Sequence, residues 1–352
     1  MPDDPFADRY LRQLRVRGFG PEGQQALRRA RVAVVGVGAL GSRVAEDLAR
    51  AGVGYLRLID RDFVEPSNLH RQHLFDEDDA RGEAPKALAA ASRIARLNGD
   101  VEVAPELRDL DATNAEELLL DVDLWLDGTD NFQTRYLLND LAVRERRSWV
   151  YGACVGTQAM AAAFVAGRSC LRCLFPEPPP AGSTETCETA GILPPAAALA
   201  TALQGALALA LLTRPGEPPA PRLYMADVAD LEPRAMRLPE RPVQGCAVCE
   251  GRAYPALELE AQSSAKALCG RNAVQLSAPA AGFPELGALA AQLERGLASQ
   301  GADGFAVERH AFMLRLHVPE GRITVFPGGR AIVQGTDDPG RARALFDRYI
   351  GS

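Results

Sequence analysis

The first third of the sequence contains residues suited to holding phosphates. Residues 36–41 read Gly-Val-Gly-Ala-Leu-Gly, a G-x-G-x-x-G turn between an apolar run and an amphipathic one. Such glycines let the backbone approach an anion, which the N-terminus of the next helix attracts. Asp60 follows Gly41 by 19 residues, where an acid can bind ribose hydroxyls. The glycines alone leave the nucleotide open, because nicotinamide and flavin coenzymes fit them as well as ATP.

Cationic side chains beyond Asp60 favour a triphosphate. Asn68 and Arg71 lie on the loop that follows this acid, and Lys86 begins an expected helix. A departing pyrophosphate needs cations and a magnesium ion, and Asp130 at a strand end is suited to hold that ion. The alternatives are a surface ion pair for Arg71, a solvated lysine for Lys86 and a helix cap for Asp130.

Four of the seven cysteines form two C-x-x-C pairs. Cys170 and Cys173 make the first pair, and Cys246 and Cys249 follow after 72 intervening residues. Tetrahedral zinc accepts four thiolates, and each C-x-x-C turn supplies two of them. The long gap means that the fold must bring the pairs together. Redox chemistry is the alternative use, and we expect a structural Zn²⁺ with no open position.

Alternating strands and helices must position these residues. Apolar runs predict strands at residues 31–35, 55–59, 101–105, 124–126 and from residue 149 onward. Helices are expected at residues 5–30, 42–51, 86–97 and 135–144. The alternation predicts an α/β fold with a doubly wound, Rossmann-like and mostly parallel sheet, whose carboxyl edge holds ligands.

The second half of the sequence has a different pattern. Residues 176–195 lack periodicity and are expected to form a long proline- and glycine-rich loop, of the kind that tends to be functional or mobile. We expect an ATP-binding domain over residues 1–252 and a small α+β domain over residues 255–352. The elements expected in the small domain are helices at 286–297 and 340–349 and strands at 312–318, 322–326 and 330–333.

Composition excludes some classes of function. The chain has 352 residues and a net charge of -7 without a long basic run, which argues against nucleic-acid binding. The N-terminus has no secretory pattern, so we expect a cytoplasmic protein with reduced cysteines. Residues 194–213 are long enough to cross a membrane, but they are mostly alanine and include Gln204. We expect a buried or interface helix there, and no membrane association.

Several motifs together resemble one protein family. They are RYLRQL at 9–14, GVGALG at 36–41, LIDRD at 58–62, SNLHRQ at 67–72, PK at 85–86 and DGTDNFQTR at 127–135. In this order and at these spacings, over roughly residues 8–250, they are similar to the ThiF/MoeB/HesA family of ubiquitin-activating-like enzymes. Residues 255–352 resemble a C-terminal extension of some bacterial members.

The resemblance implies ATP-dependent adenylation of the C-terminal Gly-Gly carboxylate of a ubiquitin-fold sulfur-carrier protein of the ThiS or MoaD type. Pyrophosphate would be released, and the pathway would be thiamine or molybdenum cofactor biosynthesis. By motif, Asp60 would bind the ribose, Asp130 would coordinate Mg²⁺, and Asn68, Arg71 and Lys86 would hold the phosphates. The family also carries a structural zinc at the four cysteines.

The resemblance further implies partners. Arg12 matches an arginine that enters the active site from the partner subunit, which implies a homodimer. A sulfurtransferase is a further expected partner. The residues expected to bind the nucleotide are Gly36, Gly38, Ala39, Gly41, Asp60, Asp62, Ser67, Asn68, Leu69, His70, Arg71, Lys86, Asp130 and Asn131. The residues expected to take part in catalysis are Asp130, Arg71, Lys86, Arg12 and Cys187.

Two interpretations of Cys187 are open, a catalytic thiol and a dispensable loop cysteine. The family has a cysteine in this T-C-x-x-A-G setting, which takes part in sulfur transfer or thioester-like chemistry in some members and is dispensable in others. Glu185 and Glu188 oppose the lowered pKa that a nucleophilic thiol needs. Cys154 is expected to be buried, and Cys269 has no assigned role.

Three other functions remain as alternatives. They are an adenylating relative that acts on a peptide or tRNA, an NAD-dependent oxidoreductase based on the glycine motif, and a non-catalytic scaffold of the same fold. The zinc cysteines and the loop at 176–195 favour the carrier-protein branch, and the complete set of active-site residues argues against a scaffold.

Overall fold

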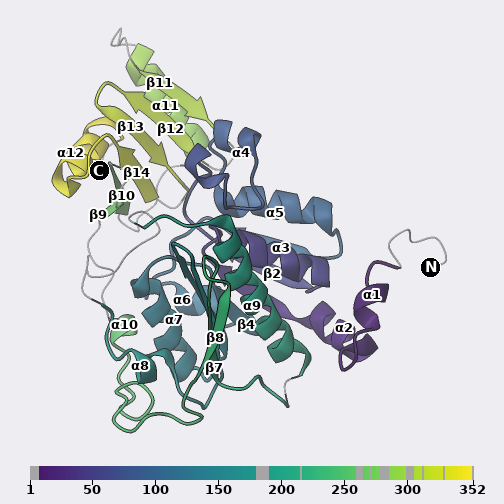
Figure 1. Cartoon of the computed structure of the whole chain (residues 1–352). Coiled ribbons are helices and arrows are strands. Elements are labelled where there is room, and N and C mark those ends of the chain that lie inside the picture. Colours follow the sequence, from purple (N-terminus) through teal and green to yellow (C-terminus); the bar gives the residue numbers. More distant parts are fainter. Residues whose placement is uncertain are drawn as a thin grey trace. The chain divides into compact units, whose positions relative to one another are not determined.

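The computed structural model describes residues 8–179, 190–214, 216–258, 265–268, 272–277, 285–298, 305–310, 313–327 and 330–350. The chain divides into an N-terminal unit, Met1–Glu260, and a C-terminal unit, Ala261–Ser352 (Figure 1). Residues 255–258, which the sequence pattern placed with the small domain, form α10 (Pro255–Glu258) in the N-terminal unit. The Ala256 N–H donates there to the Asp140 carboxylate, 3.0 Å away.

An eight-stranded sheet forms the centre of the N-terminal unit, in the order β3-β2-β1-β4-β5-β6-β7-β8. Its strands are β1 (Arg31–Val35), β2 (Tyr55–Ile59), β3 (Glu102–Glu106), β4 (Leu124–Asp127), β5 (Trp149–Val155), β6 (Gln158–Phe164), β7 (Arg222–Asp227) and β8 (Glu232–Arg237). The five strands from β3 to β5 pair in parallel, and β6, β7 and β8 continue the sheet antiparallel. The expected mostly parallel α/β sheet is therefore confirmed.

Helices cover both faces of this sheet. They are α1 (Leu11–Leu14), α2 (Gly20–Arg29), α3 (Gly41–Ala51), α4 (Glu77–Arg81), α5 (Lys86–Leu97), α6 (Ala115–Leu119), α7 (Phe132–Arg144), α8 (Leu171–Leu174) and α9 (Pro194–Thr213), with a 3₁₀ turn at Pro66–Asn68. Alternate β1 residues point to opposite cores: Val32 and Val34 pack with α2, α3, α5 and α9, and Ala33 and Val35 with α6 and α7.

Two helical segments differ from the sequence pattern. The expectation of one helix over residues 5–30 is wrong in its described part, because Gly18 and Gly20 adopt left-handed φ angles of 80° and 58° and separate α1 from α2. The 20-residue α9 is the one helix of the described chain long and apolar enough for a membrane span. It packs against β5 and β6 with Ala200, Gln204 and Ala208 fully buried, as a core helix does.

The C-terminal unit contains a second, antiparallel sheet in the order β11-β12-β13-β14-β10-β9. Its elements are β9 (Ala265–Leu268), β10 (Ala273–Ser277), α11 (Leu286–Ala298), β11 (Ala306–Arg309), β12 (Leu314–Val318), β13 (Gly321–Val325), β14 (Arg330–Gln334) and α12 (Pro339–Tyr349). The two expected helices and three expected strands are present, although Phe312 lies outside the described residues. Residues of α11 and α12, such as Leu289 and Phe346, bury one face of the sheet.

Gly54 provides a test of the packing between α2 and β2. Its N–H donates to Leu27, and a Cβ at this position would lie 1.9 Å from the carbonyl oxygen of Arg28. Gly54→Ala must push α2 away from the sheet, so we expect it to lower the free energy of unfolding by about 1–3 kcal/mol in urea denaturation. Gly99→Ala is the matched control, since no atom lies within 4 Å of its Cβ position. Equal stability of the two variants would contradict this account.

Candidate active site and metal centre

The glycine turn joins β1 to α3 at the carboxyl edge of the sheet. A Cβ on Gly41 would lie 1.7 Å from the Gly36 carbonyl oxygen, and one on Gly128 would lie 2.4 Å from the same atom. These glycines are therefore required by contacts within the chain. Gly38 differs, since its Cβ position meets only Gln72 Nε2, at 3.8 Å. The space at Gly38 lets a ligand approach the backbone, which is the role of the second glycine in a phosphate-binding turn.

Asp60 connects the glycine turn to the loop after β2. Its Oδ2 accepts a hydrogen bond from the Val37 N–H and its Oδ1 accepts one from the Asp62 N–H, both at 2.7 Å. Burial raises the pKa of Asp60, and the positive charge of Lys86 opposes that rise. Asp60 thus fixes the turn, because each of its two carboxylate oxygens accepts one backbone hydrogen bond.

Lys86 faces the same acids from the first residue of α5. Its Nζ lies 3.6 Å from Asp62 Oδ2, and its side chain is only 5% exposed. The alternative of a solvated lysine is therefore wrong. Little water screens this buried ammonium, so it interacts strongly with the neighbouring carboxylates of Asp60 and Asp62. The structure brings together Asp60, Asp62 and Lys86, as the sequence pattern implies.

The segment 67–72 follows the 3₁₀ turn and presents Arg71. Its guanidinium donates to the carbonyl oxygen of Ser67 at 2.8 Å, and no carboxylate of the described residues pairs with it. The side chain of Asn68 is buried and accepts from the Glu65 N–H, so it holds the turn. The Nδ1 of His70, an exposed residue, lies 3.1 Å from the same Ser67 oxygen.

Two further residues of this segment, and Ala39 of the glycine turn, have largely buried side chains. Ala39 and Leu69 pack against apolar clusters through their partly buried side chains. Gln72 is 4% exposed, and its Oε1 has no hydrogen-bond partner in the described structure. The sequence pattern assigned no role to Gln72, because a glutamine in a polar loop gives no sign of being buried beside Gly38.

A buried ion pair supports the loop that carries Asp130. Arg135 Nε lies 3.0 Å from Asp127 Oδ2, and Arg135 also donates to the carbonyl oxygens of Thr129 and Gly152 at 2.8 and 3.1 Å. Burial raises the pKa of Asp127, and Arg135 opposes the rise. The quoted motif DGTDNFQTR contains both residues, yet spacing alone did not reveal that its first and last members meet.

Asp130 is the free acid of this loop. Asn131, not Asp130, caps α7, because its Oδ1 accepts from the Thr134 N–H at 2.8 Å. The capping alternative for Asp130 is therefore wrong. Its side chain is exposed, and no hydrogen bond or ion pair within the described residues engages it. The carboxylate is available to a cation.

Arg12 lies away from the glycine turn and from the loop that carries Asp130. Its helix α1 is held by neighbours whose side chains bond to the ends of other helices: Gln13 donates to the Ala51 carbonyl at 2.8 Å, and Tyr10 accepts from Asn98 at 2.8 Å. These are the C-terminal ends of α3 and α5, at the sheet edge opposite the glycine turn. One chain alone does not bring the exposed Arg12 to the other candidate residues.

The two cysteine pairs do meet. All four Sγ atoms lie within 4.8 Å of one another, with Cys170 3.9 Å from both Cys173 and Cys246, and Cys173 3.8 Å from Cys249. A tetrahedron with Zn–S bonds of about 2.3 Å has edges of about 3.8 Å, so the set fits zinc. The Cys249 contact lowers the pKa of Cys170 to about 6, and burial raises that of Cys173 to about 11.

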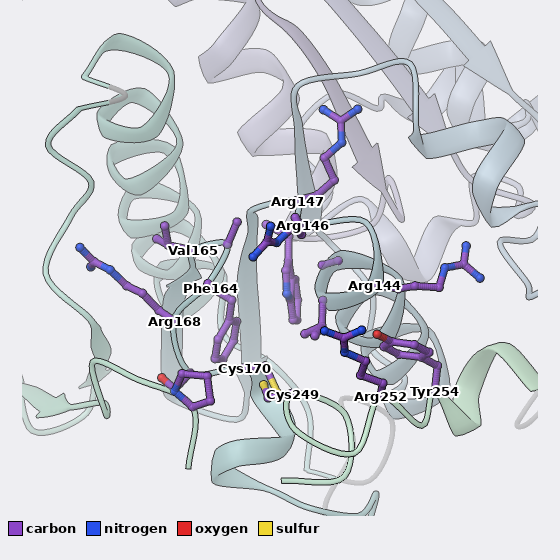
Figure 2. Close-up of a pocket in the computed structure, with 17 residues that line it drawn as sticks. Arg144, Arg146, Arg147, Phe164, Val165, Arg168, Cys170, Cys249, Arg252 and Tyr254 are labelled. Carbon is purple, nitrogen blue, oxygen red and sulfur yellow. The ribbon is translucent and has the colours of Figure 1, made fainter. Parts of the chain in front are cut away.

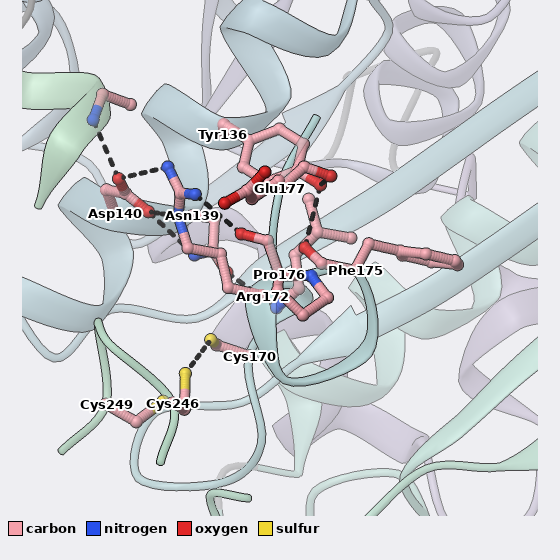
Figure 3. A network of polar contacts seen from close by, with 12 residues as sticks. Tyr136, Asn139, Asp140, Cys170, Arg172, Phe175, Pro176, Glu177, Cys246 and Cys249 are labelled. Carbon is pink, nitrogen blue, oxygen red and sulfur yellow. Dashed lines mark hydrogen bonds and ion pairs between the residues drawn. The ribbon is translucent and has the colours of Figure 1, made fainter. Parts of the chain in front are cut away.

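Arg172, inside the first cysteine pair, ties the cluster to α7 (Figure 3). It binds both carboxylate oxygens of Asp140, at 2.7 and 2.9 Å, and donates to the Pro176 carbonyl at 3.0 Å. Asn139 accepts from the Leu171 N–H at 2.7 Å. The cluster therefore fixes the middle of the helix whose first turn follows Asp130.

The other cysteines differ in how far they are described. Cys154 is buried on β5, as expected. Cys187 and Cys269 lie outside the described residues. The loop expected over 176–195 is described only at its ends, where Tyr136 donates to the Glu177 carbonyl at 2.7 Å and Leu193 N–H donates to Gly156 at 3.0 Å.

Comparisons with known proteins agree on one family. The ThiF family matches residues 10–248. The sulfur carrier protein ThiS adenylyltransferase of Bacillus subtilis is 39% identical over 344 residues, 97% of this chain and 99% of that protein. The sulfur carrier protein adenylyltransferase of Thermus thermophilus is 42% identical over 248 residues, 69% of this chain and 90% of that protein.

The fold likeness extends to solved structures. The crystal structure of E. coli MccB bound to ATP superimposes with a TM-score of 0.59 at 23% identity, over 69% of this chain and 75% of that one. At this identity the likeness shows the fold alone. The family match over most of the chain, together with the near full-length relative, establishes that the chain belongs to the ThiF family.

Proposed function

We propose that this protein uses ATP to adenylate the C-terminal Gly-Gly carboxylate of a small ubiquitin-fold sulfur-carrier protein, in thiamine or molybdenum cofactor biosynthesis. The observation that carries the proposal is the approach of buried Lys86 to Asp60 and Asp62 beside a glycine turn open at Gly38. The near full-length relative is named for adenylating ThiS, which favours a carrier protein over a peptide or tRNA.

In the reaction, a carboxylate oxygen of the carrier attacks the α-phosphorus of ATP, and the bond to the bridging oxygen breaks to release pyrophosphate. Both reactants are anions, so positioning and charge compensation dominate the rate enhancement. Lys86 and Arg71 supply positive charge next to the glycine turn. Asp130 would hold Mg²⁺, which would offset the charge of the phosphates. The Nε2 of Gln72 lies 3.8 Å from the Cβ position of Gly38, so this side chain borders the space at the glycine turn.

A nicotinamide oxidoreductase is not favoured. Hydride transfer has no use for the buried ammonium of Lys86 beside the ribose acid or for a free acid at Asp130. The family relatives reported above are named as adenylyltransferases.

The homodimer and the zinc belong to the same proposal. Arg12 lies at the opposite edge of its own sheet, so it reaches a nucleotide only in a partner subunit. The four cysteines hold a structural Zn²⁺ that supports α7 through Arg172. The acyl-adenylate must then receive sulfur, and we expect a sulfurtransferase as the donor; Cys187 is a candidate acceptor on the enzyme.

Asp130→Asn tests the catalytic assignment. The amide keeps the shape but loses the charge that holds the metal, so we expect ATP–pyrophosphate exchange with the cognate carrier to fall about a hundredfold or more. Asp100→Asn, an exposed acid in a turn, is the matched control and keeps full exchange. Full exchange by Asp130→Asn would refute its role, and no exchange by the wild type with any Gly-Gly carrier would refute the function.

Mixing two inactive variants tests the composite site. Arg12→Ala and Asp130→Asn homodimers should each be inactive, whereas subunit exchange creates heterodimers with one intact site. A one-to-one mixture should recover about a quarter of wild-type exchange activity, because half of the dimers carry one good site of two. Activity that stays at the level of the separate variants would show that Arg12 does not act across subunits.

Metal content tests the cysteine cluster. We expect one zinc per chain by elemental mass spectrometry, loss of that zinc in Cys249→Ser, and a lower melting temperature for the variant because metal binding stabilises only the folded state. Cys154→Ser, whose residue lies outside the cluster, should retain its zinc. A wild-type protein that contains no zinc, and whose melting temperature equals that of Cys249→Ser, would contradict a structural zinc.

A further inference from the structure

A pocket of about 490 Å³ in the N-terminal unit has a strongly basic lining (Figure 2). It lies where β5 begins and β6 ends, at the opposite edge of the sheet from the glycine turn, with Cys170 and Cys249 at its border. The arginines that line it are Arg144, Arg146, Arg147, Arg168 and Arg252. The volume is that of a small-molecule site, and five arginines are a local reversal of sign in a chain of net charge -7.

Two of these arginines occupy backbone positions that favour glycine. Arg146 is the residue after the C-cap of α7, with φ 53°, and the hydrogen bonds Arg147 N–H to Ala142 and Arg146 N–H to Val143 form a Schellman motif. Arg252 has φ 51° immediately after Gly251. A side chain with a Cβ costs about 1 kcal/mol in this conformation relative to glycine. A merely solvated surface arginine gives no compensation for that cost.

The five arginines differ in whether their guanidinium groups already have partners within the described residues. Arg144 pairs with Glu116 and Glu145, and Arg147 and Arg168 donate to backbone carbonyls, of Leu120 at 2.9 Å and Pro219 at 3.0 Å.

By contrast, no hydrogen bond or ion pair within the described residues engages the exposed guanidinium of Arg146 or Arg252. In Figure 2, the side chains of Arg144, Arg147 and Arg168 extend outward, and those of Arg146 and Arg252 lie nearer the centre of the group of lining residues.

We propose that this pocket binds the phosphate group of a small molecule, held by the guanidinium groups of Arg146 and Arg252. A phosphate dianion matches the two positive charges, and guanidinium forks bind phosphate oxygens bidentately. The competing explanation is that the arginines only offset the negative charge of the zinc thiolates. The two explanations differ in what glycine substitution does to zinc and to phosphate.

Arg146→Gly separates binding from folding, since glycine suits the left-handed position and leaves the fold intact or more stable. The full-length protein is loaded with Mg²⁺ and a non-hydrolysable ATP analogue to fill the proposed nucleotide site. Inorganic phosphate and ribose 5-phosphate are then titrated calorimetrically at constant ionic strength. We expect one phosphate per chain in the wild type, binding at least about tenfold weaker in Arg146→Gly and in Arg252→Gly. Arg144→Gln is the matched control and binds within twofold of wild type.

The two probes distinguish the sources of the phosphate. Equal affinities assign the site to inorganic phosphate, and tighter binding of ribose 5-phosphate assigns it to a phosphorylated metabolite. Wild-type binding that is absent, or that survives both glycine substitutions, overturns the proposal. Loss of zinc in the glycine variants without a change in phosphate affinity overturns it in favour of the charge-compensation account.

Discussion

The contact of three glycines around one carbonyl oxygen is the constraint on which the candidate active site depends. The Gly36 oxygen leaves no room for a Cβ on Gly41 or Gly128, so the end of β1, the start of α3 and the end of β4 meet without side chains between them. Two loops leave from this point, one anchored by Asp60 to the glycine turn and one that carries Asp130. A methyl group here would separate the acid expected to bind ribose from the acid expected to hold a metal.

Buried charge is organised around this contact in two ways. The Asp127–Arg135 pair is closed, since both partners are satisfied by one another and by neighbouring hydrogen bonds. Removing either partner would leave an uncompensated charge in the core. The group of Asp60, Asp62 and Lys86 adjoins the glycine turn, because Asp60 accepts from the Val37 N–H and Lys86 lies 3.6 Å from Asp62. The first arrangement supports a loop, and the second holds an ammonium and two carboxylates at the turn that we expect to bind a nucleotide.

Local patterns could be predicted from the sequence, whereas most long-range contacts could not; the meeting of the two cysteine pairs, expected from the four thiolates that zinc accepts, is an exception. The glycine turn, the first strands and the two cysteine pairs are encoded within short windows, so their types were predicted correctly. The strands β6 and β8 read QAMAAAF and EPRAMR, which lack the β-branched alternation that marks a strand. The Asp127–Arg135 pair and the burial of Gln72 depend on which elements pack together, and the spacing of residues carries no sign of that. Gly18 and Gly20 did signal locally that the helix breaks there. The helix-favouring residues on both sides outweighed that signal in the prediction.

Helix α7 connects the Asp130 loop, the first cysteine pair and the basic pocket. Its N-terminus follows Asp130, its middle is held at Asn139 and Asp140 by the first cysteine pair, and its C-terminus ends at the Arg146 turn. Thirteen residues at about 1.5 Å each separate the two ends by about 20 Å. Because the cysteine cluster fixes the helix midway, a ligand at Arg146 meets a helix that is already held in place. The Asp127–Arg135 pair holds the loop before the helix, and the first cysteine pair holds its middle, so neither support depends on occupancy of the basic pocket.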